Sequence, residues 1–188
     1  LASAMVAVGE EMGKRVVAFL TRMDAPLGRM VGNACEVQES IDVLRGGGPE
    51  DIITLVETLT GAMVEIAQGV SAEEGKRRVR GVLQNGQAYA KWQAMVSAHG
   101  GDLDALPTHL GETPIAASRA GYVSGIDGLD VGLVGVELGA GRTRSDQAID
   151  PLVGIRIDAP VGTFVQAGQP VMTVLHGSSG APPERIES

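Results

Sequence analysis

Apolar side chains recur every three or four residues through much of the first half of the chain, which is the spacing of amphipathic helices. This spacing predicts helices over residues 1–12 and 31–44. A third helix is predicted from Pro49, because proline suits the first turn and Glu50 and Asp51 lie at the positive end of the helix dipole. Its apolar stripe consists of Ile52, Leu55, Val56, Leu59, Met63 and Ile66.

Two further helices follow from local signals. The segment Ser71-Ala72-Glu73-Glu74 is a capping-box pattern and predicts a helix that ends at Asn85-Gly86. A short fifth helix carries the apolar residues Tyr89, Trp92, Met95 and Val96.

Residues 16–20 form a continuous apolar run of strand length, typical of a buried strand in a parallel sheet. Residues 24–28 then break the pattern as a loop. Ligands of open α/β sheets bind at the carboxyl ends of the strands, so this loop is the first candidate binding segment.

Beyond the helices the character of the sequence becomes extended. Short β-rich segments separated by Gly, Asp and Pro turns cover residues 115–118, 121–126, 133–138, 153–157 and 171–175. We therefore expect an α/β portion over residues 1–100, a linker over 101–111 and a β-rich module over 112–188. The fold class is predicted to be α/β plus α+β.

Composition and charge argue against several classes of function. A net charge of -8 and a pI near 4.8 argue against nucleic-acid binding. The one dense basic run, residues 76–80, follows two glutamates and is predicted to be a solvated helix face. With a single cysteine, no export signal and no membrane-length apolar run, we expect a cytoplasmic protein without membrane contact. Because the sequence opens with Leu1 inside a helical pattern, we also expect a piece of a longer protein.

Few residues offer chemistry. Cys35 lies in a helical pattern and is interpreted as an inert thiol, and the three histidines are too dispersed to predict a zinc site. Residues 138–142 are interpreted as a turn, and Asp146 and Asp150 can neutralise the neighbouring arginines, Arg142 and Arg144.

The helix acids Glu36, Glu39 and Asp42 leave two alternatives open. They are either surface carboxylates or, for one of them, a ligand that joins the carbonyls of residues 27–30 around a hard cation.

The β-rich module resembles a barrel-sandwich hybrid of the biotinyl and lipoyl carrier type. Residues 121–126 and 161–175 are similar to its two halves, with turn glycines at 162 and 168 and a stiffening Pro170. The chain's lysines, Lys14, Lys76 and Lys91, all lie outside the module, which excludes a covalent swinging arm.

A longer segment carries the strongest resemblance. Residues 20–46, L-T-R-M-D-A-P-L-G-R-M-V-G-N-A-C-E-V-Q-E-S-I-D-V-L-R-G, closely resemble thymidine phosphorylases and related pyrimidine-nucleoside phosphorylases. The similarity continues through Gly48-Pro49, Asp51, residues 98–102, Leu106-Pro107, residues 121–123, residues 138–142, Ile149-Asp150, Gly162, Gly168, Pro170 and Leu175-His176. The resemblance implies the later part of the phosphorylase α/β domain followed by the family's C-terminal module.

The family cleaves a pyrimidine nucleoside with phosphate, for example thymidine to thymine and 2-deoxy-α-D-ribose 1-phosphate, in pyrimidine salvage and catabolism. Its phosphate loop, K-x-S-T-G-G-x-G-D, and its base-binding segment, R-D-x-T-x-T-V, do not occur in this sequence. No catalytic residue is therefore assigned, and this chain alone is expected to be inactive. The family's homodimer is formed by helices that precede the matched region.

The resemblance also implies a structural monovalent or calcium-like cation, with no cofactor required. The matching positions are the backbone carbonyls of Leu27 and Met30 and the side chain of Glu39. One alternative hypothesis is a non-catalytic module that binds a partner or a small ligand. Another is an AMP phosphorylase of the same superfamily, which the segments P-L-G and E-V-x-E favour less.

Overall fold

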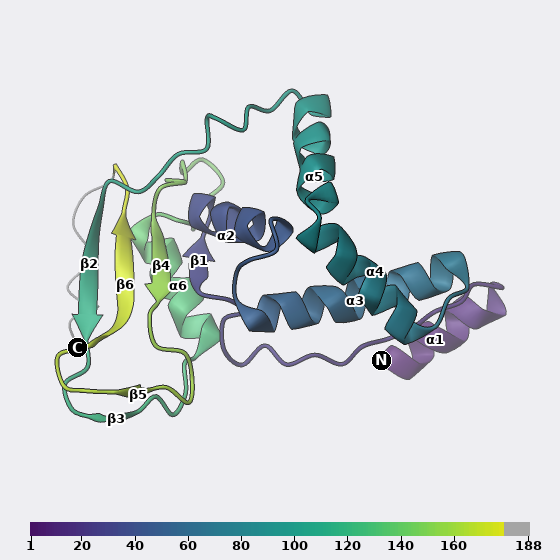
Figure 1. The fold of residues 1–188 in the computed structure, drawn as a ribbon. Helices are drawn as coiled ribbons and strands as arrows, with labels where there is room; N and C mark the ends of the chain where they lie inside the picture. The colour runs from purple at the N-terminus through teal and green to yellow at the C-terminus, as the bar shows by residue number, and fades with distance from the viewer. Residues whose placement is uncertain (179–188) are drawn as a thin grey trace.

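The computed structural model describes residues 1–178, which form helices and two antiparallel sheets (Figure 1). The helices within this range are α1 (Ala2–Glu11), α2 (Ala34–Leu44), α3 (Glu50–Gln68), α4 (Ala72–Gln84), α5 (Gln87–Ala98) and α6 (Gly128–Leu138). The strands are β1 (Met30–Gly32), β2 (Gly111–Ala116), β3 (Gly121–Tyr122), β4 (Gly154–Ile157), β5 (Phe164–Val165) and β6 (Pro170–His176). The last ten residues of the expected β-rich module, 179–188, lie outside this range.

The helices α3, α4 and α5 confirm the prediction from local signals. α3 follows Pro49 and ends at Gly69, whose φ of 66° is the left-handed conformation of a helix C-cap. α4 begins after Ser71, whose hydroxyl accepts a hydrogen bond from the amide of Glu74 at 3.3 Å. These helices are therefore encoded locally.

α3 and α4 pack closely because glycines lie at their contact. A Cβ atom added at Gly75 would overlap the backbone carbonyl of Gly61 on the facing helix. At the rim of the same pair, Arg80 donates to Glu57 with an Nε–Oε1 distance of 2.8 Å.

Among residues 1–178 no single helix has the length and apolar character of a membrane span, although α3 and α4 taken together as a bent pair meet that test.

The larger sheet has the strand order β1-β4-β6-β2 and is antiparallel throughout. β1 belongs to the helical portion yet forms the edge of this sheet, so the two expected portions share one hydrogen-bonded structure. The buried apolar side chains of the sheet are Val153, Ile155, Ile157, Val174 and Leu175.

Two glycines allow β1 and α2 to approach β4. Gly32 pairs with Gly154, and a Cβ added at Gly154 would lie 2.6 Å from the Cys35 sulfur. The thiol therefore fills the space that side chains would occupy in this strand pair.

The strand predicted over residues 16–20 is wrong. This segment is extended but has no strand partner among residues 1–178, and Leu20 is 90% exposed. A strand exists only when a neighbour satisfies its backbone groups, and the described strands pair with one another elsewhere. The expectation of a parallel sheet fails for the same reason.

Two other boundaries also need correction. The helix predicted over 31–44 begins too early, because residues 31 and 32 belong to strand β1 and α2 starts only at Ala34. The strand predicted over 133–138 is part of helix α6. The Asp127 carboxylate caps that helix by accepting hydrogen bonds from the amides of Leu129 and Asp130, at 2.9 and 3.1 Å, and this local signal outweighs the β-branched composition.

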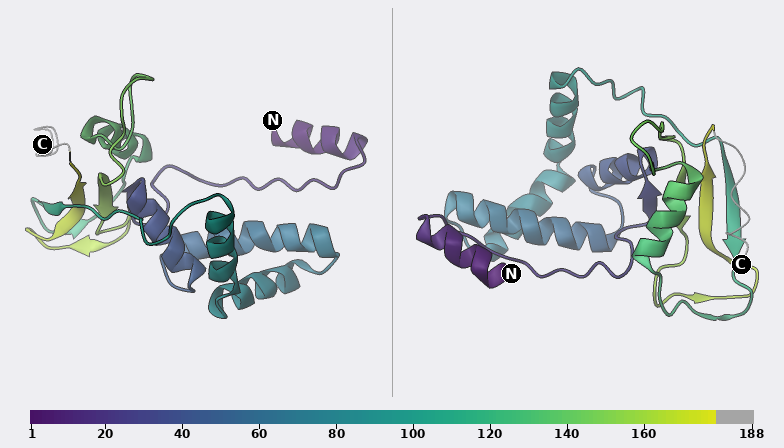
Figure 2. Two further views of the ribbon diagram at one scale, coloured as in Figure 1. Left: turned by 90° about the horizontal axis from the view of Figure 1, so that it is seen from above. Right: turned by 180° about the vertical axis from the view of Figure 1, so that it is seen from behind.

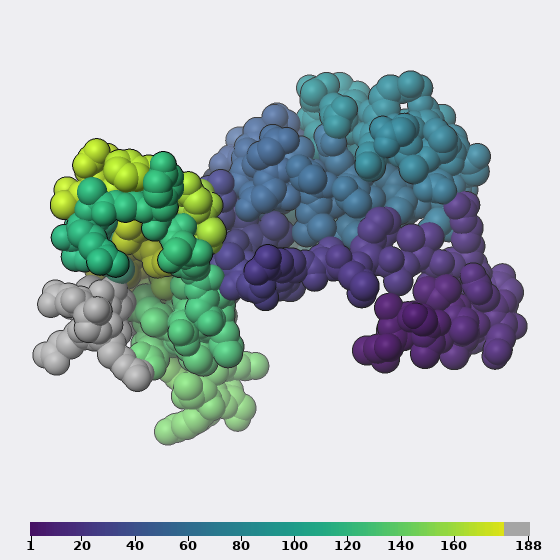
Figure 3. Space-filling model, turned by 90° about the horizontal axis from the view of Figure 1, so that it is seen from below, coloured from purple at the N-terminus to yellow at the C-terminus, as the bar shows by residue number. Residues whose placement is uncertain are grey.

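The arrangement is elongated rather than round. Figure 2 shows α1 far from the sheet and the extended segment after it running back along the helical half toward β1. In Figure 3, seen from below, α1 forms a separate lobe at the edge of the molecule. Helices and sheets thus coexist, as the mixed fold class predicts, and the expected linker, residues 101–111, crosses between α5 and β2 (Figure 1).

Candidate functional site

The loop before β1 is shaped by Gly28. Its φ of 77° is left-handed, a conformation that favours glycine. The Gly28 amide donates to Asp51 Oδ2 at 3.1 Å, and the Arg29 guanidinium donates to the Gly28 carbonyl at 2.8 Å. The start of α3 thus fixes one side of the loop.

Glu39, from the middle of α2, fixes the other side. Its Oε1 accepts from the amide of Arg29 at 2.9 Å, and its Oε2 accepts from the amide of Met30 at 3.4 Å. Glu39 is only 8% exposed. Burial raises the pKa of this carboxyl above its usual value, and the two amide donors act in the opposite direction.

Of the three residues predicted to bind a cation, the structure places Met30 and Glu39 side by side, through a hydrogen bond from the Met30 amide to the carboxylate. The carbonyl of Arg29 accepts from the amide of Ile157 at 2.7 Å, which places Arg29 in the ladder with β4. Because pairing groups alternate along a strand, the amide of Met30 faces away from β4 and donates to Glu39. Leu27 lies earlier in the loop and lines a separate groove with Asp51 and Thr54.

The chemistry of this donor set agrees with a cation only in part. Among residues 1–178 no group of three or more His, Cys, Asp or Glu side chains is arranged to hold a metal ion. A cation here would depend on backbone carbonyls together with the Glu39 carboxylate. Hard cations accept such oxygen ligands.

The neighbouring acids have other roles. Glu36 accepts from the amide of Gly32 at 2.7 Å and so holds the end of β1. Asp42 accepts from Gln38 at 3.1 Å along the exposed side of α2. Of the three acids singled out in the sequence, only Glu39 is buried.

An adjoining pocket of about 220 Å³ lies between α2, the linker and the sheet. Glu39, Cys35, His109 and Arg156 are among its lining residues. Burial, with a contribution from Glu36, raises the pKa of Cys35, so the thiol is less reactive than usual. The geometry supports a packing role for this cysteine.

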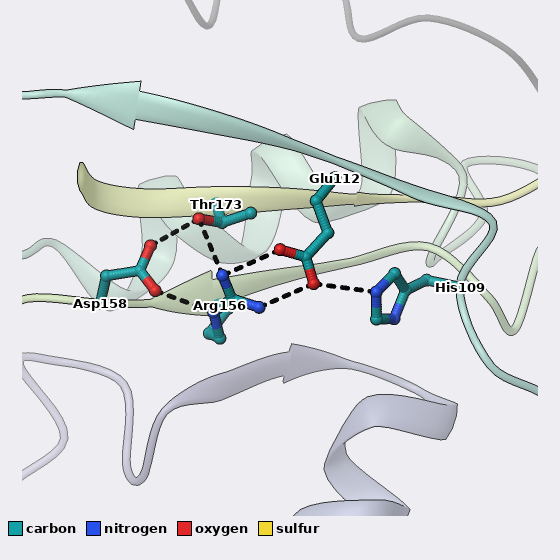
Figure 4. Close-up of polar contacts among 5 residues, drawn as sticks. All are labelled: His109, Glu112, Arg156, Asp158 and Thr173. Atoms are coloured by element: carbon teal, nitrogen blue, oxygen red, sulfur yellow. Dashed lines mark hydrogen bonds and ion pairs between the residues drawn. The ribbon is translucent and has the colours of Figure 1, made fainter.

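Sequence reasoning missed a polar network across the sheet (Figure 4). Arg156 on β4 donates to both carboxylate oxygens of Glu112 on β2, at 2.9 and 3.0 Å, and to Asp158 at 2.8 Å. Thr173 on β6 donates to Asp158 at 2.5 Å, and His109 contacts Glu112 at 2.9 Å. The only signal in the sequence is that Arg156 and Asp158 are two apart, on one face of a strand.

This network raises the pKa of Arg156, chiefly through its hydrogen bonds to Glu112 and Asp158. It lowers the pKa of Glu112, first through the hydrogen bonds from Arg156 and then through its charge and His109. Because the guanidinium is already paired with two carboxylates, it ties three strands together and has little capacity for an anionic ligand.

The remaining predicted positions are dispersed. Residues 138–142 cover the end of α6, where Gly139 has a φ of 110°, so this segment is a turn as predicted, although it follows a helix. Arg144 pairs with Asp146 at 2.7 Å, as expected. His176 contacts Thr113 on β2, whereas His109 belongs to the sheet network.

Two family models match this chain. The family model described as "Glycosyl transferase family, a/b domain" matches residues 1–89, and the model described as "Pyrimidine nucleoside phosphorylase C-terminal domain" matches residues 122–188. Together these matches define the class as a glycosyltransferase-type protein.

The chain is 37% identical over 181 residues to the pyrimidine-nucleoside phosphorylase of Bacillus subtilis strain 168. It is 36% identical to that of Staphylococcus haemolyticus strain JCSC1435 and 35% identical to that of Staphylococcus aureus strain USA300, over the same length. The similarity covers 93% of this chain, which spans 42% of the length of each relative. The chain belongs to the pyrimidine-nucleoside phosphorylase family and corresponds to the C-terminal part of its members.

Proposed function

We propose that this chain supplies the C-terminal part of a pyrimidine-nucleoside phosphorylase that converts thymidine and phosphate to thymine and 2-deoxy-α-D-ribose 1-phosphate. The observation that carries the proposal is continuous similarity over 93% of the chain to relatives named for that activity. The homodimer and the cytoplasmic location implied by the resemblance belong to the same proposal.

The local geometry assigns this part a positioning role. Glu39 and Asp51 hold the loop of residues 24–30 from two helices, while β1 ties the loop to the sheet. Phosphorolysis requires donors fixed around phosphate and around the departing base, and the family motifs that provide them do not occur in this sequence. The chain by itself should therefore not turn over nucleosides.

The proposal includes a barrel-sandwich hybrid in the second portion. Its support is the pairing of β3 with β5, which joins the two segments that resemble the halves of that fold. Gly162 and Gly168 both have positive φ, of 89° and 84°, as the tight turns of the second half require.

We also assign the carbonyls of Leu27 and Met30 and the carboxylate of Glu39 as part of a site for a monovalent or calcium-like cation. The support is the buried position of Glu39 beside the backbone of Met30. Such a cation would compensate the charge of this carboxylate and fix the loop.

A second candidate function is that of a binding module that acts through the extended segment at residues 16–20. Val17 and Phe19 are 45% and 43% exposed, and the segment has no strand partner among residues 1–178. An incoming strand could pair with its backbone, which is the way exposed edges bind partners.

A chimera separates the two candidates. In the Bacillus subtilis relative, the part that aligns with this chain is replaced by this chain, and phosphate-dependent release of thymine and uracil is measured. Activity of the chimera, with none from the chain alone, supports the phosphorylase. A folded chimera without activity favours the binding module.

A further inference from the structure

A second groove lies between α2 and α5. It has a volume of about 530 Å³ and is bounded by α2, α5 and linker residues 101–106. This volume is within the range of about 300–1,000 Å³ that small-molecule sites occupy. The groove shares no lining residue with the loop of residues 24–30 or with Glu39.

Aromatic side chains form one wall of this groove. The rings of Tyr89 and Trp92, one turn apart on α5, are stacked with centroids 5.9 Å apart and an interplanar angle of 25°. The Arg45 guanidinium lies 4.2 Å from the centroid of Tyr89 and donates to its hydroxyl at 2.7 Å. The chain has only five aromatic residues of the Phe, Trp and Tyr types, so two of them in one groove is a marked concentration.

The rim of the groove is polar and slightly acidic. Gln38 and Gln93 offer both donors and acceptors, and Asp102 and Asp104 offer carboxylates. With one guanidinium against two carboxylates, the formal charge of this lining is negative. A phosphate group would be repelled, whereas the polar edge of an uncharged ring would find partners.

We propose that this groove binds an uncharged, planar heteroaromatic compound of nucleobase or nucleoside size, packed against the aromatic wall at the Trp92 ring, which Tyr89 supports by stacking on it. Every base has a π face, and stacking on aromatic side chains is a common way to hold one. The inference does not depend on the proposed phosphorylase function, since it uses no residue of the loop site and requires no phosphate.

Trp92 is the only tryptophan in the chain, so its fluorescence reports on this groove. Uridine is added to the full chain without phosphate, and we expect a saturable change in Trp92 emission. Uridine 5′-monophosphate should bind about fivefold more weakly, because its phosphate adds repulsion from the rim. Tetramethylammonium tests whether the groove instead binds a cation through its aromatic rings, and it should not compete with uridine.

Substitutions place the signal in the groove. Tyr89→Leu should weaken uridine binding about tenfold, because it removes the ring that stacks on Trp92 and supports the aromatic wall of the groove. The matched control, Tyr122→Leu, removes an aromatic side chain that contacts Phe164 in the smaller sheet and should leave binding unchanged. If Tyr89→Leu does not fold, as judged by circular dichroism, the exposed rim variant Gln93→Ala decides, with weakening of several-fold expected from loss of a polar partner of the ligand.

Four results would overturn the proposal: no saturable change with uridine, equal affinity for the nucleotide, competition by tetramethylammonium, or unchanged binding in both groove variants. None of these results would change the expected outcome of the phosphorylase assay, because turnover by the chimera depends on phosphate and on the phosphorylase active site and not on this groove.

Discussion

Single residues decide the geometry of the loop before β1. Glu39 accepts two backbone amides and Gly28 adopts a conformation unfavourable for other residues. Two consequences can be measured at this scale, one in stability and one in cation response.

Gly28→Ala should lower the free energy of unfolding by about 1–3 kcal/mol, from its positive φ and from crowding. An added Cβ would overlap the Glu39 carboxylate and lie 2.5 Å from Ile52 Cδ1. Urea denaturation monitored by circular dichroism measures the change. The control is Gly132→Ala in α6, where a Cβ meets nothing within 4 Å. Equal stability of the two variants would show that the loop is not built as described.

The proposed cation site predicts a specific salt response. At constant ionic strength, K⁺ or Ca²⁺ should raise the Tm of the chain, because an ion bound only by the folded state stabilises it. Glu39→Gln should abolish this rise, whereas Asp42→Asn, on the exposed side of the same helix, should retain it. The same response in both variants would contradict the assignment of Glu39.

At the scale of elements, glycines and polar ladders set how helices and strands pack. Gly75→Ala should destabilise the chain by about 1–3 kcal/mol, because α4 would have to move away from the Gly61 carbonyl. Gly81→Ala on the same helix meets nothing within 4 Å and should stabilise by up to about 1 kcal/mol. Thermal unfolding distinguishes them, and a neutral Gly75→Ala would disprove the close helix contact.

The sheet network predicts a pH dependence. Arg156 lowers the pKa of Glu112 below its ordinary 4.5, so the stabilising contribution is complete above that pH and is lost as the pH falls through the lowered value. Glu112→Gln should therefore unfold more readily than the parent at neutral pH and show a weaker loss of stability on acidification. The control is Glu10→Gln on the exposed side of α1. Parallel acid curves for Glu112→Gln and the parent would rule out this contribution.

Some of the helices and strands could be predicted from the sequence alone, and others could not. α3 and α4 were predictable because Pro49, Ser71 and Asn85 give local signals at their ends. The segments at 16–20 and 133–138 were not, because an apolar β-branched run suits a strand or a helix and only pairing or capping decides. β1 could not be predicted either, since its partner β4 lies far along the sequence.

Of the residues in the candidate sites, the sequence singled out some and missed others. Glu39 was singled out through its position in the family pattern, and the structure places it beside the backbone of Met30. The network around Arg156 and the aromatic groove at Trp92 depend on contacts between distant segments, which no local spacing reveals.

At the scale of the whole molecule, the sheet formed by β1 with β4, β6 and β2 joins the portion matched by the glycosyltransferase model to the portion matched by the phosphorylase C-terminal model. The two portions should therefore unfold together, since β1 lies in the first and its partners in the second. Residues 16–20 are extended, and Val17, Phe19 and Leu20 are exposed.

The most direct test of the central claim is the rate of thymine release by the Bacillus subtilis chimera that carries this chain. We predict phosphate-dependent turnover within about tenfold of the parent enzyme, equivalent to about 1.4 kcal/mol in the barrier. The same chimera with Gly28→Ala should be slower. A chimera that folds and binds nucleoside yet releases no thymine or uracil would contradict the claim.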